Sequence, residues 1–76
     1  MSQHDSSDYL PDVWRDPAGN PVSCVDKLKL LQENLEELRE MAQEALEDAV
    51  VMGCDEGQTR KVLADLVAGL EKPFAR

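Results

Sequence analysis

The sequence predicts an all-α fold: an antiparallel helical hairpin with a long first helix, a short second helix and an irregular N-terminal arm. Two observations predict it. Apolar residues recur at helical spacing in two separate stretches, and a short connection that begins with a glycine joins those stretches. The arm covers residues 1–22, of which residues 1–8 are expected to be a flexible tail, and the hairpin domain covers residues 23–76. We expect two hairpins to pair into a four-helix bundle.

The arm combines a short apolar cluster with a turn signal. The cluster, which is the candidate partner-binding segment, consists of Tyr9, Leu10, Val13 and Trp14. After it, Pro17 suits the second position of a turn that begins at Asp16 and closes at Gly19. We therefore expect the chain to bend before the long helix. The cluster is interpreted either as cover for apolar surface of the chain itself or as a short motif that binds another protein.

The long helix is predicted over about residues 24–52, where apolar or small residues recur at alternating spacings of four and three. This spacing is typical of a helix that buries one narrow face against other helices. Ser23 with Asp26 resembles a capping box at its start, and Gly53 suits the left-handed residue that ends a helix. The predicted seam for the core and the dimer consists of Leu28, Leu31, Leu35, Leu38, Ala42, Ala45, Ala49 and Met52.

The short helix is predicted over about residues 56–71. Asp55 with Gln58 three residues later is a capping signature, and Pro73 is expected to stop the helix. The short connection before it favours antiparallel helices. Its predicted core residues form a broad stripe: Val62, Leu63, Leu66, Val67 and Leu70.

The two predicted helices differ in length, at about 42 Å and about 24 Å, so the second helix covers only the C-terminal part of the first. Four leucines of the seam, from Leu28 to Leu38, then have no local partner. Burial of each would stabilise the protein by roughly 1.5–3 kcal/mol, and this free energy is not gained if the leucine stays in water. A second copy paired antiparallel near Leu38 would cover them with large residues facing small ones. That register places Leu28 near Ala49, Leu31 near Ala45, Leu35 near Ala42 and Lys27 near Asp48 of the second copy. Two other possibilities stay open: the arm folds back over the leucines, which is compatible with the dimer, or the leucines bind a different protein.

Charge excludes several classes of function. The formal net charge is −8, and residues 23–53 contribute −5 of it, from eight acids and three bases. An acidic chain repels nucleic acid and anionic membrane surfaces, so neither is an expected partner. The first residues also lack the basic and then apolar pattern of a secretion signal, and no apolar run reaches the roughly 20 residues that a membrane span needs, so we expect neither. We expect a cytoplasmic protein.

Catalysis and metal binding have little support in the sequence. The only histidine, His4, lies in the predicted tail, and there is neither a Gly-rich phosphate loop nor a Cys-x-x-Cys pair. We therefore expect no enzyme, cofactor or metal site. Five glutamates follow one face of the long helix, which we interpret as a solvated face, with weak binding of a divalent cation or a basic partner as the alternative. They are Glu33, Glu37, Glu40, Glu44 and Glu47.

The two cysteines, Cys24 and Cys54, flank the long helix, too far apart for a disulfide within one chain. The favoured interpretation is that both are small buried hydrophobic residues in a reducing cytosol. The alternative is a thiol-dependent redox or metal-responsive module that uses both cysteines across a dimer.

The most consistent function is a small non-enzymatic protein–protein interaction module, such as an adaptor, regulator or accessory factor, that acts as a homodimer. The predicted arrangement is similar in pattern to small Rop-like hairpin dimers. The acidic face argues against the RNA binding that this similarity would imply.

Overall fold

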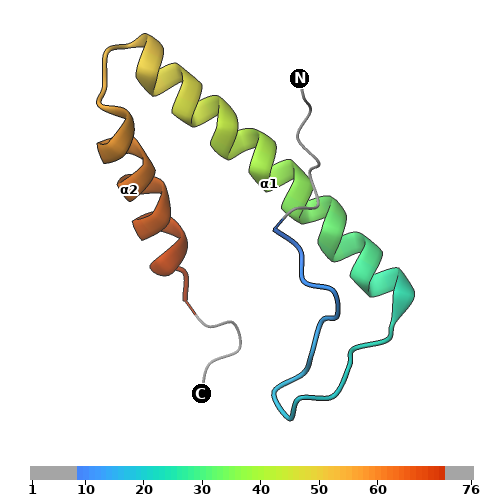
Figure 1. Cartoon of the computed structure of the whole chain (residues 1–76). Helices are drawn as coiled ribbons and strands as arrows, with labels where there is room; N and C mark the ends of the chain where they lie inside the picture. Colours follow the sequence, from blue (N-terminus) through green and yellow to red (C-terminus); the bar gives the residue numbers. More distant parts are fainter. Residues whose placement is uncertain (1–8, 72–76) are drawn as a thin grey trace. The chain divides into compact units, whose positions relative to one another are not determined.

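The structure, a computed structural model, describes residues 9–71 and contains two helices in that range, α1 (Val25–Val51) and α2 (Glu56–Ala68) (Figure 1). No strand lies in this part of the chain, apart from one isolated bridge between Arg15 and Pro21. The prediction of an all-α helical hairpin is confirmed. The pairing of two hairpins into a four-helix bundle stays a prediction.

The chain divides into two compact units, and the boundary falls inside α1 between Glu37 and Leu38. Of the described residues, the first unit holds the arm and the beginning of α1 (9–37), and we call it the arm unit. The second, the hairpin unit (38–71), holds the rest of α1, the connection and α2.

The arm reverses direction through a tight turn at Asp16. The Asp16 carbonyl oxygen accepts a hydrogen bond from the Gly19 backbone N–H at 2.9 Å, and Gly19 has a φ of +93°. The Asp16 side chain also accepts hydrogen bonds from the backbone N–H groups of Ala18 and Asn20. A type I turn followed by a left-handed glycine is a common hairpin connection. The turn predicted from Asp16, Pro17 and Gly19 is confirmed.

Two further hydrogen bonds hold the sides of this turn together. The Val22 backbone N–H donates to the Trp14 carbonyl oxygen at 2.8 Å, and the Asp16 N–H donates to the Asn20 carbonyl oxygen at the same distance. The Arg15 guanidinium donates to the Gly19 carbonyl oxygen at 3.0 Å. The arm is therefore ordered by its own backbone before it meets α1.

The start of α1 differs from the capping prediction. The helix begins at Val25, and the Leu28 N–H donates to the carbonyl oxygen of Cys24 at 3.0 Å, so the capping position is Cys24. Among residues 9–71, no hydrogen bond from the Ser23 side chain to the helix is present. The capping box predicted at Ser23 is wrong because Ser23 lies one residue too early. Asp26 still lies in the first turn, where the helix dipole favours an acid.

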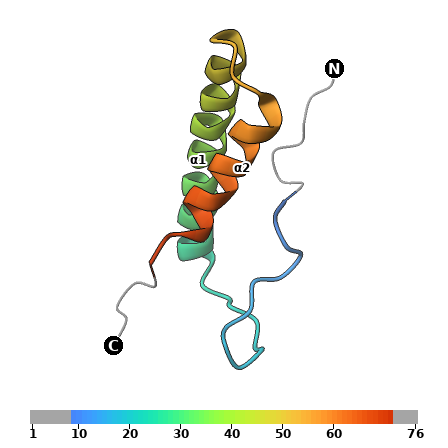
Figure 2. The same cartoon turned by 90° about the vertical axis from the view of Figure 1, so that its left-hand side faces the viewer.

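The end of α1 follows the prediction for Gly53, which has a φ of +96°. Its N–H donates to the Val50 carbonyl oxygen at 3.0 Å, and the Cys54 N–H donates to the Ala49 carbonyl oxygen at 2.8 Å. These two bonds form a Schellman motif, which satisfies carbonyl groups that the helix end would otherwise leave unpaired. The chain leaves α1 through this turn and enters α2 (Figures 1 and 2).

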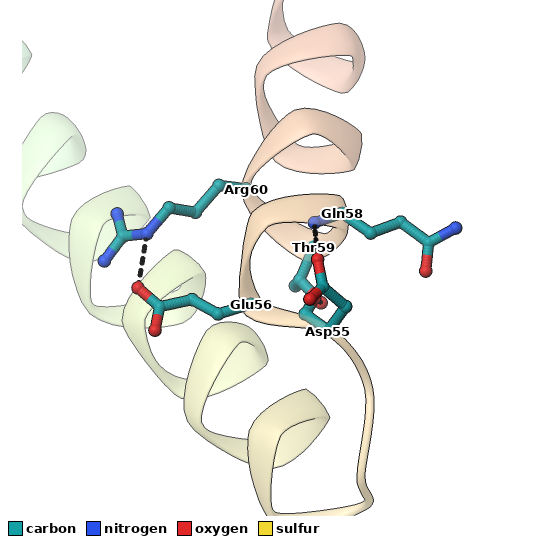
Figure 3. A network of polar contacts seen from close by, with 5 residues as sticks. All are labelled: Asp55, Glu56, Gln58, Thr59 and Arg60. Carbon is teal, nitrogen blue, oxygen red and sulfur yellow. Dashed lines mark hydrogen bonds and ion pairs between the residues drawn. The ribbon is translucent and has the colours of Figure 1, made fainter.

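The start of α2 has the cap that the sequence predicts. The Asp55 carboxylate accepts a hydrogen bond from the Gln58 backbone N–H at 2.8 Å, and the Asp55 carbonyl oxygen accepts one from the Thr59 hydroxyl at 2.9 Å (Figure 3). The predicted end near residue 71 is wrong, since α2 ends at Ala68 and Gly69 is its C-cap. Glycine is a poor helix former, and it ends the helix early. Pro73, the expected stop, lies outside the described residues.

Candidate interaction surface

The predicted seam of α1 divides into two rows. The inner row, with residues seven apart, consists of Leu28, Leu35, Ala42 and Ala49, and all four are half-buried. The outer row, with the same spacing, consists of Leu31, Leu38, Ala45 and Met52. Of the outer row only Leu31 is half-buried, whereas Leu38 is 48% exposed, Met52 is 77% exposed and Ala45 is exposed. The inner row is therefore less exposed than the outer row.

The arm covers the beginning of the inner row. Leu10, Pro11 and Trp14 of the arm line one shallow hollow together with Val25 and Leu28 of α1. Leu10 and Trp14 are half-buried, as is Val22 on the other side of the turn. In the arm unit the arm therefore lies beside Leu28, and cover of the other predicted leucines by the arm stays a prediction.

The candidate partner-binding segment is split by this packing. Leu10 and Trp14 lie against α1, whereas Tyr9 and Val13 are exposed. The segment is therefore not wholly available as a binding motif in this structure.

In the hairpin unit, α2 covers the later part of the inner row. Ala42, Ala49 and the flanking Leu46 are half-buried, as are Thr59 and Leu63 of α2. Leu63 is the only half-buried member of the predicted core of α2. The other four members are exposed: Val62, Leu66, Val67 and Leu70. Within residues 9–71 no side chain is fully buried, so these residues do not form a closed core in a single chain.

A second shallow hollow lies beside the turn between the helices. Leu46, Val50 and Val51 line it from α1, and Glu56 and Arg60 line it from α2. Arg60 Nε donates to the Glu56 carboxylate at 2.9 Å within this wall (Figure 3). Ligand sites normally enclose most of the ligand surface, and an open hollow of this kind does not. Neither hollow therefore provides an enclosed pocket for a small molecule.

Met41 flanks the predicted seam, and its spacing predicts that it widens the apolar side of the helix. It is 66% exposed, lies three residues after Leu38 and four before Ala45, and so shares the side of α1 that carries the outer row. Met41 makes the exposed side of α1 wider than the seam alone.

Charge is distributed unevenly along α1. After Arg39 the helix contains four acids and no base: Glu40, Glu44, Glu47 and Asp48. The only bases near its start are Lys27 and Lys29. All five glutamates of the predicted acidic face are exposed. In the part of the chain that the structure describes, no three potential metal-ligating side chains come together.

The two cysteines are both exposed, so the interpretation of Cys24 and Cys54 as buried hydrophobic residues is wrong for the single chain. Cys24 occupies the capping position before α1 and Cys54 follows the turn after it, so neither lies on a covered helix face. The 27 residues of α1 separate them.

Comparisons with known proteins give no family for this chain: no family model matches it, and no similar curated protein or solved structure was found. Neither α1 nor α2 is apolar over a stretch long enough to cross a membrane. The argument about function therefore depends on the surface described above.

Proposed function

We propose that this protein is a small non-enzymatic protein–protein interaction module that acts as a homodimeric helical bundle. One observation carries the proposal: in residues 9–71 no side chain is fully buried, while large apolar residues of both helices are exposed. Exposed apolar patches mark interaction sites in proteins that fold stably. A second copy is the partner that we propose, and a cytoplasmic location is part of the same proposal.

Chain length supports this proposal. A chain of 76 residues buries only about 60% of the surface that its unfolded form exposes, and association is one of the few ways to enlarge such a core. The exposed residues of α2 and of the outer row would gain roughly 1.5–3 kcal/mol for each large side chain that becomes fully buried. The gain is limited to the fraction that is exposed in the single chain.

The experiment is a mass measurement by light scattering on the full chain, across a range of protein concentrations. We expect twice the chain mass of 8.5 kDa at micromolar concentration. A mass of one chain at every concentration would overturn the homodimer. A lysate pull-down would then address the remaining part of the proposal, a heterologous partner.

The thiol-dependent module is the second candidate, and the exposure of Cys24 and Cys54 favours it. Accessible thiols react with oxidants and metals, whereas buried ones do not. The Cys24→Ser variant separates the two candidates. An adaptor keeps its partner and its mass in this variant, whereas a thiol module loses its response to oxidant or zinc.

A further inference from the structure

Antiparallel pairing of two copies would set leucine against alanine in the inner row as well as in the outer row, but only the outer row is mostly exposed and has a residue at its centre. Its spacing of seven extends back from Leu31 to Cys24, which gives the series Cys24, Leu31, Leu38, Ala45 and Met52. Leu38 is the middle member. When two copies of the helix run antiparallel and are centred on Leu38, Leu38 faces Leu38 of the second copy, Leu31 faces Ala45, and Cys24 faces Met52. Each pair away from the centre joins a larger residue to a smaller one, as close packing between helices requires.

The charges of α1 are also complementary when two copies run antiparallel. Lys27 and Lys29 lie near the start of α1, and the acids without bases lie after Arg39. The antiparallel register that centres on Leu38 sets Lys27 beside Asp48 of the second copy, and both residues are exposed. A parallel register would instead set Lys27 beside Lys27 and acid beside acid, which is unfavourable.

We infer that a second copy of this chain docks antiparallel on the outer row, with the twofold axis at Leu38, and that the inner row stays covered by the chain's own arm and α2. This inference rests on the proposed homodimer and assigns its face and register. Like charges elsewhere in a dimer of two acidic chains make the Lys27 to Asp48 pairs more important for register than for affinity.

The face is tested by Leu38→Glu, with Val51→Glu as the matched control. Val51 is 86% exposed and lies six residues after Ala45, about 120° around the helix from it. We expect Leu38→Glu to raise the dimer dissociation constant roughly a hundredfold, because two carboxylates would meet at the axis. Val51→Glu is expected to leave it within about threefold. Circular dichroism of each variant checks that the helices persist. A dimer that is equally stable in both variants would overturn the assigned face.

The register is tested by charge reversal. Lys27→Glu and Asp48→Lys are each expected to raise the dissociation constant roughly tenfold at low salt, since each changes two equivalent pairs. The double variant restores opposite charges and is expected to return within about threefold of the original value. Lack of restoration would contradict the register even when the dimer itself persists.

Thiol crosslinking is an independent test of whether the two chains pair antiparallel or parallel, and it uses the unmodified sequence, so no variant has to fold. A bifunctional maleimide is added to the full chain, and the crosslinked dimer band is digested and analysed by mass spectrometry. The antiparallel register brings Cys24 near Cys54 of the second copy, and both are exposed. Mixed Cys24–Cys54 peptides in the dimer band support the inference. Peptides that join only like cysteines would indicate a parallel pair and overturn it. A chain that is monomeric in light scattering contradicts the homodimer itself.

Discussion

Each unit covers its own stretch of α1 with a segment of different construction. In the arm unit the inner row has leucines, and an irregular segment with Leu10 and Trp14 lies beside the first of them, Leu28. In the hairpin unit the inner row has alanines, and a helix covers it. Small side chains let a second helix approach closely.

Different interactions stabilise the segment that covers α1 in each unit. The arm is held by a turn and two flanking backbone hydrogen bonds, at 2.8 Å each, that form without α1. The cover in the hairpin unit is a helix of 13 residues, which is marginal by itself in water and depends on its cap, its turn and its packing. The arm unit therefore depends most on one large side chain, and the hairpin unit depends on several small contributions.

The largest expected effect is that of Trp14→Ala. Truncation of a fully buried Trp costs about 3–5 kcal/mol, and Trp14 is half-buried, so we expect a loss of about 2 kcal/mol in the free energy of unfolding. Urea unfolding followed by circular dichroism at one fixed protein concentration measures it. Tyr9→Ala, at an exposed arm position, is the control and should cost much less.

The matched variant in the other unit is Leu63→Ala, for which about 1–2 kcal/mol is expected because Leu63 is also half-buried. A smaller loss for Trp14→Ala than for Leu63→Ala would contradict the dependence of the arm unit on one side chain. An unchanged midpoint for Trp14→Ala together with loss of a protein partner would instead identify the arm as a recognition motif.

The next effect concerns the two turns, which both require a glycine with positive φ. An added Cβ would meet no atom within 4 Å at Gly19 or at Gly53, so any cost of alanine there is backbone strain, not a clash. We expect Gly19→Ala and Gly53→Ala to cost about 1–2 kcal/mol each. Asparagine tolerates this conformation better, so Gly53→Asn should recover part of the loss. Equal stability of the Ala and Asn variants would show that strain is not the cause.

Much of the fold was predictable because it follows from local rules. The turn at Asp16, the left-handed Gly53 and the cap at Asp55 each need only a few neighbouring residues, and the structure confirms each of them. The start of α1 was misassigned by one position because Ser23 and Cys24 are adjacent and the serine is the better capping residue.

The surface was less predictable than the elements. Heptad spacing defines a seam, but both of its rows have the same spacing, so the sequence alone does not say which row the chain covers itself. The side on which the arm returns decides it, and that side depends on how the segment with Leu10 and Trp14 packs on Leu28. The exposure of Cys24 and Cys54 was missed for a similar reason, since composition suggests burial while position at the helix ends determines exposure.

The two helices also differ in their caps, which predicts a third effect. Asp55 accepts the Gln58 N–H at the start of α2, whereas the capping position of α1 is a cysteine. Asp55→Ala should cost about 1 kcal/mol, and Asp55→Ser should retain most of the stability. Cys24→Asp should add stability, by up to a similar amount, because it supplies α1 with the acceptor that α2 already has. Thermal unfolding of the three variants checks the order. If Cys24→Asp is neutral, packing of the arm rather than capping fixes the start of α1.

The smallest effect is expected from the two ion pairs of α2, which differ in orientation. Glu56 precedes Arg60 by four residues, and Lys61 precedes Asp65 by the same spacing, with N–O distances of 2.9 Å and 2.6 Å. All four side chains are more than half exposed, so each pair is worth at most about 0.3–0.5 kcal/mol. The acid lies nearer the N-terminus only in the first pair, which is the orientation that the helix dipole favours. Glu56→Gln should therefore cost a few tenths of a kcal/mol and Asp65→Asn less, although the second pair is the shorter one. The difference should shrink in about 1 M salt, where charges are screened beyond about 3 Å. The opposite order would mean that the contact distance outweighs the dipole in this helix.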